Sequence, residues 1–236
     1  RYLDVIDEEV KPWSYMKFPH LKQLGPADGW YRVGPLARLQ NVDRIPTPRA
    51  EARRQAFRAR WKGAISHAAL ATHWARMIEM LHSLEVVADL LTQLAGDALL
   101  RESDLAVPLP RVPAESPDRE GVGIIEAPRG TLIHHYRIGA DDLITQCNLI
   151  VSTTHNNQAM NEAVRDVAAS HFDGRALTEG LLNRIEVAIR AYDPCLSCAT
   201  HALGQMPLEL TLQGADGAVL DRLVRDGEGR IGRVDD

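Results

Sequence analysis

The chain has 236 residues, of which 45% are hydrophobic, and this is enough to bury a core in one large domain or two small ones. Its 27 Lys and Arg residues against 32 Asp and Glu leave a formal net charge of −5, which gives no electrostatic reason to expect nucleic acid or an anionic membrane as the main partner. No apolar run approaches the roughly 20 residues of a membrane-spanning helix, and the three cysteines fit a reducing compartment, most simply the cytoplasm.

The first half of the chain predicts a loop-rich lead-in followed by helices. Residues 1–48 are rich in Pro, Gly and aromatic residues, which favour short strands and turns. From Thr47 and Pro48, an N-cap and first-turn pair, to about Gly96, apolar residues recur at intervals of three and four, as in one or two helices with a buried stripe. This stripe, expected to be core, comprises Ala64, Ala68, Leu70, Ala71, Trp74, Met77, Ile78, Leu81, Leu84, Val87, Ala88 and Leu91. A basic run is expected to form a solvated helix face or to contact an acidic partner: Arg49, Arg53, Arg54, Arg58 and Arg60.

The second half predicts a small sheet between helices. A Pro-rich connection at residues 108–117 is followed by short branched or alternating runs, typical of strands, and then by two amphipathic segments. The expected strands are 122–126, 132–138, 143–151 and 208–212, with a hairpin turn at 139–142, and the expected helices are 158–170 and 178–192. The fold class is therefore mainly α with a small β-sheet, an α+β arrangement.

A cluster of candidate metal ligands follows the last helix. Asp193 and Pro194 lead into Cys195, Cys198 and His201, so two thiols and an imidazole lie within one turn-sized segment that Pro194 stiffens. Such a C-x-x-C pair serves as metal ligands, as a redox dithiol or as half of a zinc site. A closed zinc site needs four ligands, yet the only other cysteine is Cys147, so by itself the site looks half built.

Three segments of the chain resemble signatures of the large subunit of nickel-iron hydrogenases. They are the run Arg190–His201 around the C-x-x-C motif, the run GVGIIEAPRGTLIHHY at residues 121–136, and the run YRVGPLARL at residues 31–39. The wording after His201 (ALGQMPL) and from Cys147 (CNLIVSTTHNN) is most similar to the soluble, cytoplasmic, NAD-reducing branch.

The resemblance implies a role for each residue of the C-terminal motif. Cys195 would be a terminal nickel ligand and proton acceptor, Cys198 would bridge nickel to an iron that carries CO and cyanide, and His201 would bind a separate magnesium or iron ion. In the family four thiolates from two C-x-x-C motifs hold nickel, and soft thiolates suit these metals. Because this chain has only three cysteines, residues 1–201 are expected to be the C-terminal half of a longer subunit.

The same resemblance implies a pocket around the iron ligands. Arg129, on the expected turn after Pro128, would donate to one cyanide, a task that fits a planar and permanently protonated group. Ser152 would donate its hydroxyl to the second cyanide, with Thr153 as the neighbouring choice. The alternative for Arg129 is a structural bridge to Glu126.

For the whole enzyme the resemblance implies reversible splitting of H2 into protons and electrons. Electrons would pass to NAD through a small subunit, followed by diaphorase-type iron-sulfur and flavin subunits. Residues 202–236 would be a C-terminal extension of an unprocessed precursor, which a nickel-dependent endopeptidase removes by cutting after His201. Two alternatives remain open: a catalytically silent electron-transfer or assembly subunit of the same ancestry, and a zinc or dithiol binding module.

Overall fold

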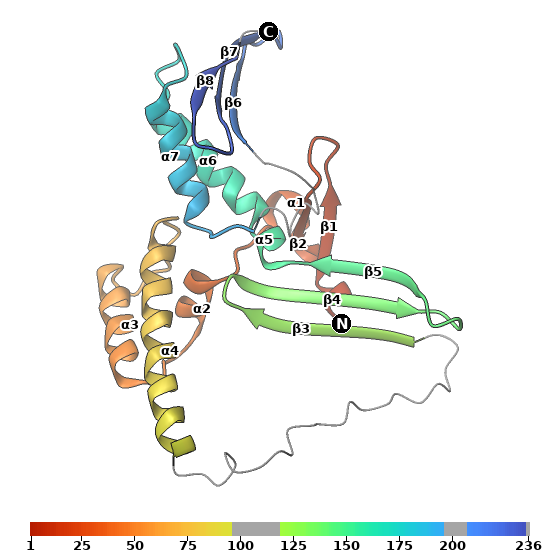
Figure 1. Ribbon diagram of the computed structural model, residues 1–236, viewed down its shortest axis with the longest axis vertical. Helices are drawn as coiled ribbons and strands as arrows, with labels where there is room; N and C mark the ends of the chain where they lie inside the picture. The colour runs from red at the N-terminus through yellow and green to blue at the C-terminus, as the bar shows by residue number, and fades with distance from the viewer. Residues whose placement is uncertain (96–118, 196–206, 235–236) are drawn as a thin grey trace. The chain divides into compact units, whose positions relative to one another are not determined.

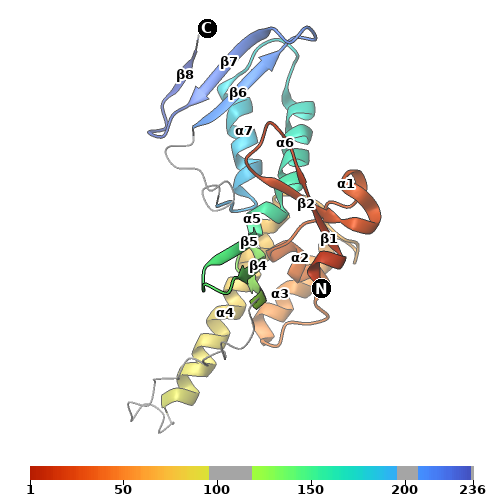
Figure 2. The same cartoon turned by 90° about the vertical axis from the view of Figure 1, so that its right-hand side faces the viewer.

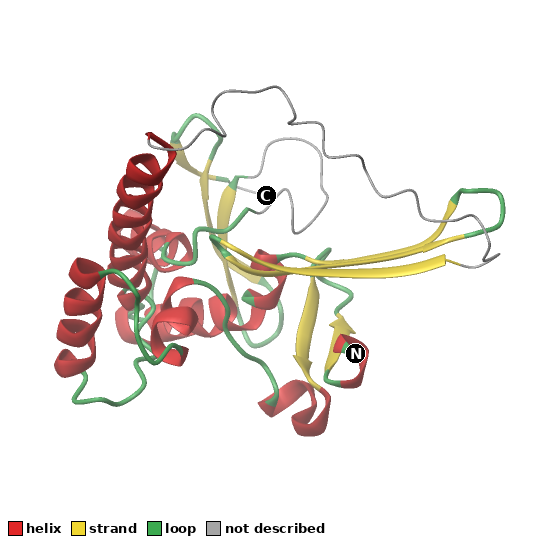
Figure 3. Cartoon of the chain, turned by 90° about the horizontal axis from the view of Figure 1, so that it is seen from below, coloured by secondary structure: helices red, strands yellow, loops and turns green. Residues whose placement is uncertain are grey.

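The computed structural model of the chain describes residues 1–95, 119–195 and 207–234. These residues belong to two compact units. One unit comprises Arg1–Gly34, Ala127–Thr131 and Ile150–Asp236, and the other comprises Pro35–Glu126 and Leu132–Leu149. Within the described ranges the helices are accompanied by three sheets, of two, three and three strands (Figure 3), which confirms the α+β class.

Three helices occupy the first part of the second unit (Figure 1). They are α2 (Pro35–Asn41), α3 (Pro48–Arg60) and α4 (Ala71–Ala95), of which α3 and α4 match the expected helical region. Their shared core consists of Leu36, Leu39, Ala50, Phe57, Ala71, Ala75 and Ile78. Although α4 is 25 residues long, none of the helices in the described ranges is long and apolar enough to cross a membrane.

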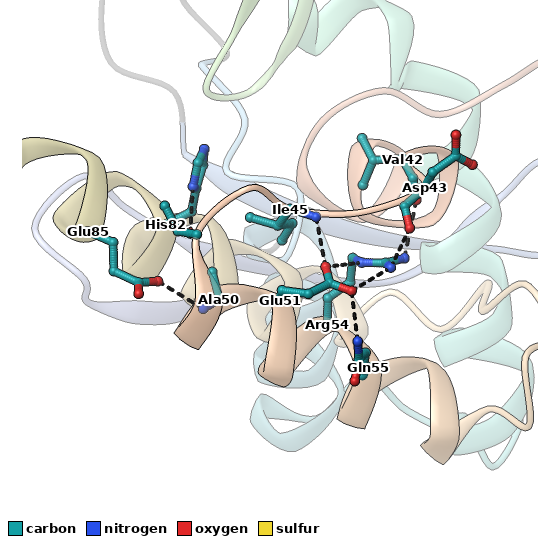
Figure 4. Close-up of polar contacts among 10 residues, drawn as sticks. Val42, Asp43, Ile45, Ala50, Glu51, Arg54, Gln55, His82 and Glu85 are labelled. Carbon is teal, nitrogen blue, oxygen red and sulfur yellow. Dashed lines mark hydrogen bonds and ion pairs between the residues drawn. The ribbon is translucent and has the colours of Figure 1, made fainter. Parts of the chain in front are cut away.

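The N-terminus of α3 is held by side chains of α4 (Figure 4). The Glu85 carboxylate accepts hydrogen bonds from the backbone N–H groups of Arg49, at 3.1 Å, and Ala50, at 2.9 Å. A carboxylate is favourable there because the first N–H groups of a helix carry partial positive charge. Thr47 precedes the helix as expected, but its hydroxyl does not cap α3 and instead lies 2.9 Å from Nδ1 of His82.

Arg54 corrects the expectation that the basic run of α3 is a solvated face. Its side chain is buried, and it donates to both carboxylate oxygens of Glu51 at 2.8 Å. It also donates to the carbonyl oxygens of Val42, at 3.2 Å, and Asp43, at 2.5 Å (Figure 4). Glu51 also accepts from the N–H of Ile45 at 2.7 Å. The Arg54–Glu51 ion pair therefore binds the backbone of the loop before α3 to the helix.

The apolar stripe of α4 is only partly buried, so this part of the prediction is wrong. Ala71 and Ile78 of the stripe lie in the core, but Met77, Leu84 and Leu91 are among the exposed hydrophobic residues. The C-terminal turns of α4 extend past the N-terminus of α3 (Figures 1 and 2), and the core residues of α4 lie in its first half.

The central sheet forms as the sequence predicts. It contains β3 (Arg119–Ala127), β4 (Gly130–Ile138) and β5 (Ile144–Ile150) in the order β3-β4-β5, with strand directions that alternate (Figure 1). The hairpin between β4 and β5 closes through a 2.9 Å hydrogen bond from the N–H of Gly139 to the carbonyl of Leu143.

The first unit begins with short elements, as expected for its Pro- and Gly-rich sequence. Strands β1 (Ile6–Val10) and β2 (Lys17–Leu21) pair antiparallel, with Ile6 opposite Leu21. The remaining short elements here are two 3₁₀ turns, η1 (Tyr2–Asp4) and η2 (Lys22–Leu24), and the single-turn helix α1 (Gly25–Asp28).

Three helices of the first unit follow β5. They are α5 (Ser152–His155), α6 (Asn157–His171) and α7 (Glu179–Arg190), and the last two match the expected helices within a few residues. The hydroxyl of Thr178 caps α7 by accepting from the N–H of Leu181 at 3.1 Å.

The segment after His201 forms a sheet of its own (Figure 2). Its strands are β6 (Leu208–Gln213), the predicted one, together with β7 (Val219–Arg225) and β8 (Ile231–Arg233). Leu223 of β7 is buried in one cluster with Leu181, Leu182 and Ile185 of α7. We call this three-stranded element the tail sheet, and it shares an apolar core with α7.

Candidate metal centre

The turn that carries Cys195 is fixed by the end of α7. Asp193 adopts a positive φ of 51°, and its N–H donates to the carbonyl of Arg190 at 2.9 Å. Tyr192 is buried, and its hydroxyl donates to the carbonyl of Ala159 on α6 at 3.1 Å. Helix α7 therefore delivers the chain to Cys195 through a tightly bonded turn, as the Pro194 pattern predicts.

Thr153 holds the backbone of Cys195 from the other side. The N–H of Cys195 donates to Oγ1 of Thr153 at 3.0 Å. Thr153 is buried on α5, directly after β5. Cys195 is half-buried, and the turn that carries it is held by the end of α7 on one side and by Thr153 on the other.

Arg129 reaches the same turn from the loop between β3 and β4. Its Nε donates to the carbonyl of Asp193 at 2.8 Å and lies 3.1 Å from a carboxylate oxygen of that residue. The alternative partner is not used, because Glu126 pairs instead with Arg38 at 2.5 Å, and Arg38 also binds Glu79. The alternative of an Arg129–Glu126 bridge is therefore wrong, and the guanidinium of Arg129 lies at the C-terminal motif.

Two glycines allow two of the three family-like segments, at residues 31–39 and 121–136, to approach each other. Gly130 has a φ of 132°, and a Cβ there would lie 2.3 Å from a methyl carbon of Val33. Gly34 has a φ of 99°, and a Cβ there would lie 2.8 Å from the carbonyl oxygen of Arg129. Only glycine fits both the backbone conformation and the space at these positions. The segment at residues 31–34 thus packs against the Arg129 turn.

Ser152 and Pro128, the other predicted pocket residues, lie in the same region of the first unit. The hydroxyl of Ser152 is buried and donates to the carbonyl of Gly130 at 2.7 Å, which ties α5 to the turn formed by Pro128 and Arg129. Of the two neighbouring hydroxyl groups, that of Thr153 therefore contacts the turn that carries Cys195, and that of Ser152 contacts Gly130.

Tyr31, His155 and Asn156 support the site and were not singled out in the sequence. The N–H of Val33 donates to the side-chain oxygen of Asn156 at 2.9 Å, and the Tyr31 hydroxyl lies 2.6 Å from Nδ1 of His155. Burial, together with the negative charge of Glu8, raises the pKa of Tyr31 above its usual range. The phenol therefore keeps its proton and stays hydrogen-bonded to the ring of His155.

A sequence signal for these supporting residues does exist. Residues 152–157 form an unbroken polar run (STTHNN) directly after a strand, and every one of them is buried. Buried polar side chains persist only when they are hydrogen-bonded, so a polar run at a strand end indicates a built network.

Cys198 and His201 lie outside the described residues, so their predicted roles remain predictions. Within the part of the chain that is described, no three His, Cys, Asp or Glu side chains converge as a metal cluster. The described donors nevertheless fit a nickel-iron group. Cys195 offers a soft sulfur ligand, and Arg129 offers a planar cationic donor that suits an anionic group beside it.

Comparison with known proteins identifies a family. The family described as nickel-dependent hydrogenase matches residues 1–201. The beta subunit of the NAD-reducing hydrogenase HoxS of Cupriavidus necator is 50% identical over 225 residues, which cover 95% of this chain and 45% of that subunit. An iron-sulfur subunit of the F420-non-reducing hydrogenase of Archaeoglobus profundus is 41% identical over 93% of this chain and 45% of its own length.

Solved structures show the same relationship. A crystal structure of an NAD+-reducing [NiFe]-hydrogenase in the H2-reduced state superposes with a TM-score of 0.73 at 57% sequence identity, covering 85% of this chain and 42% of that chain. The [NiFeSe]-hydrogenase of Dm. baculatum superposes with a TM-score of 0.52 at 25% identity. This chain therefore spans less than half the length of the relatives that it matches.

Proposed function

Because this chain belongs to the nickel-dependent hydrogenase family, we propose that it is part of the large subunit of a nickel-iron hydrogenase that reversibly converts H2 to protons and electrons. The observation that carries the proposal is the meeting of Arg129 and Thr153 at the turn that presents Cys195. The chain supplies Cys195 and Cys198, and the other thiolates of a four-sulfur nickel site come from the part of the subunit that this chain does not match. When bound, the nickel-iron centre polarises H2 so that it can be split heterolytically.

Each residue around Cys195 has its own role in the proposed reaction. The sulfur of Cys195 accepts the proton released from H2, which requires a thiolate held at a fixed position, and Thr153 fixes the backbone of that residue. The planar guanidinium of Arg129 would donate to the anionic ligands of iron, while Pro128 and Ser152 shape the loop from which it extends. His201 binds a separate magnesium or iron ion.

We assign NAD as the electron acceptor and the cytoplasm as the location, on the likeness to the NAD-reducing relatives. Electrons leave through a small subunit, followed by diaphorase-type iron-sulfur and flavin subunits. Because an F420-non-reducing hydrogenase subunit is also similar, at 41% identity, the electron acceptor is tested separately from H2 oxidation.

The test uses the full-length subunit purified with its partners. Cys195→Ser is expected to lose nickel and H2-dependent dye reduction together, whereas Cys147→Ser, which changes an exposed cysteine of β5, is expected to keep both. Nickel and activity retained in the Cys195→Ser enzyme would overturn the assignment. H2-dependent reduction of a viologen dye without reduction of NAD would preserve the hydrogenase but remove NAD as its acceptor.

We further propose that residues 202–236 are removed on maturation by a nickel-dependent endopeptidase that cuts between His201 and Ala202. Two observations support this: the family match ends at residue 201, and the tail sheet that follows is built entirely from later residues. The intact mass of the active enzyme tests it. A mass that ends at His201 is expected, and active enzyme that retains the tail sheet contradicts the proposal.

A further inference from the structure

Helix α4 carries an exposed apolar seam. Six residues repeat at intervals of three and four along more than four turns, and their exposed fractions run from 41% for Leu94 to 65% for Leu84. The seam consists of Met77, Met80, Leu84, Val87, Leu91 and Leu94. Scattered exposed apolar residues are ordinary, but a continuous row of this length marks an interaction surface.

The seam lies on the face of α4 that its described neighbours do not use. Ala71, Ala75 and Ile78 pack into the core with α2 and α3, and Glu85 binds the N-terminus of α3. At 3.6 residues per turn, the seam from Met80 onward falls on the opposite side of the helix from Ile78.

The residues that flank the seam indicate what kind of surface covers it. In a two-stranded coiled coil the flanking positions are typically charged, and they pair across the two helices. Here the flanks of the outer half are Ala88, Leu90 and Ala95, all apolar and exposed. A broad apolar face of this kind is typical of a helix in a bundle, where more than one neighbour covers it.

The relatives provide the source of those neighbours. The Cupriavidus relative and the chain in the NAD+-reducing crystal structure are both more than twice as long as the part that this chain matches, at 45% and 42% coverage. We propose that the α4 seam is the docking surface for apolar helices from the rest of the large subunit, the part that this chain does not match. This inference rests on the proposed function only in taking the chain as one part of such a subunit.

The first test is complex formation. This chain is co-expressed with the unmatched part of a full-length relative, and the two are purified through a tag on one of them. Leu84→Glu with Leu91→Glu places two carboxylates in the seam and is expected to reduce recovery of the complex at least tenfold. Thr92→Glu with Gln93→Glu adds the same charge to the other side of α4 and is expected to leave recovery unchanged. Equal recovery with the seam variant overturns the proposal.

The second test concerns the chain alone and excludes other occupants. An uncovered seam binds a hydrophobic dye, and the seam variant is expected to remove that binding while keeping the helical circular dichroism of the unaltered chain. Equal dye binding by the unaltered chain and the seam variant would mean that the seam is already covered. This result would overturn the proposal. A dimer that the seam variant converts to a monomer makes a second copy the occupant instead. Neither test measures H2 turnover. Both therefore report on the docking surface even if the proposed hydrogenase activity is absent.

Discussion

Arg129 performs at least one task that the structure shows directly, since it binds the carbonyl and the carboxylate of Asp193. A lysine could keep a single bond to that turn, but it has no planar pair of donors for a further anionic ligand. Arg129→Lys in the full-length enzyme is therefore expected to lower turnover by orders of magnitude while nickel and iron stay bound. Metal analysis and H2 oxidation are measured together.

Arg137→Lys is the matched control for this change. Arg137 and Arg129 are both arginines of the β3–β4 hairpin with 47% of the side chain exposed, and Arg137 pairs with Glu120. The control is expected to keep full turnover. Unchanged turnover in Arg129→Lys at full metal occupancy would reduce Arg129 to a structural partner of Asp193.

We expect Thr153 to stabilise the turn that carries Cys195 and so to affect nickel binding. Thr153→Val preserves shape and removes the oxygen that accepts from the N–H of Cys195, and the loss of this hydrogen bond costs about 1 kcal/mol. The variant is expected to load less nickel per subunit. Thr154→Val, one residue along α5 and equally buried, is the control that should load normally. Equal nickel content in the two variants would contradict the role given to Thr153.

At the scale of elements, the loop before α3 is expected to respond to acid. The hydrogen bonds from Arg54 lower the pKa of Glu51 from 4.5 to about 2. Because the folded pKa lies below the unfolded one, the ion pair stabilises the fold fully above about pH 4.5, and this stabilisation is lost as the pH falls towards 2.

Glu51→Gln tests this ion pair. The substitution is expected to lower the free energy of unfolding at pH 7 by about 2 kcal/mol, and the difference from the unaltered chain should shrink between pH 4.5 and 2. Urea unfolding at several pH values measures it. Glu228→Gln, which changes an exposed partner of Arg230, should show no such pH-dependent difference. A gap that stays constant down to pH 2 would contradict the lowered pKa.

Elements whose patterns are local could be predicted, and elements that depend on distant partners could not. The hairpins of the central sheet and helices α6 and α7 follow from alternation, periodicity and turn residues within each segment. Helix α2 was missed because its seven residues follow a Pro- and Gly-rich stretch, and its leucines are buried only through the core shared with α3 and α4. Arg54 was misplaced for the same reason, since its burial depends on the carbonyls of the loop before α3.

The candidate site shows the same division between local and distant information. Cys195 and Arg129 could be named from motifs, but the choice between Ser152 and Thr153 could not, because adjacent hydroxyls differ only in where the helix turns them. The structure separates them, with Ser152 bonded to Gly130 and Thr153 to Cys195. The apolar repeat of α4 was identified correctly, but its exposure in the described chain could not be predicted; by our proposal, the rest of the large subunit covers it.

For the whole molecule, the 236-residue chain by itself is expected to bind nickel weakly. It has three cysteines, of which Cys147 lies exposed on β5, so it cannot supply the four thiolates of the proposed site. Equilibrium dialysis of the isolated chain, followed by metal analysis, should find no nickel retained at sub-micromolar free concentration. Stoichiometric nickel under those conditions would contradict the four-thiolate assignment.

The tail sheet is held by more than the peptide bond that we expect to be cut. Its Leu223 shares a core with α7, Arg225 binds Glu186 of that helix, and Asp221 accepts from the N–H of Leu177 at 2.8 Å. While the chain is intact, the tail sheet is tethered to α7. It therefore binds the apolar side of that helix at the millimolar effective concentration typical of a short linker. Cleavage after His201 would turn this into an ordinary two-molecule equilibrium, so release of the tail would depend on dilution and on rivals for the same surface. Maturation would then have a mass-action step that the protease does not control.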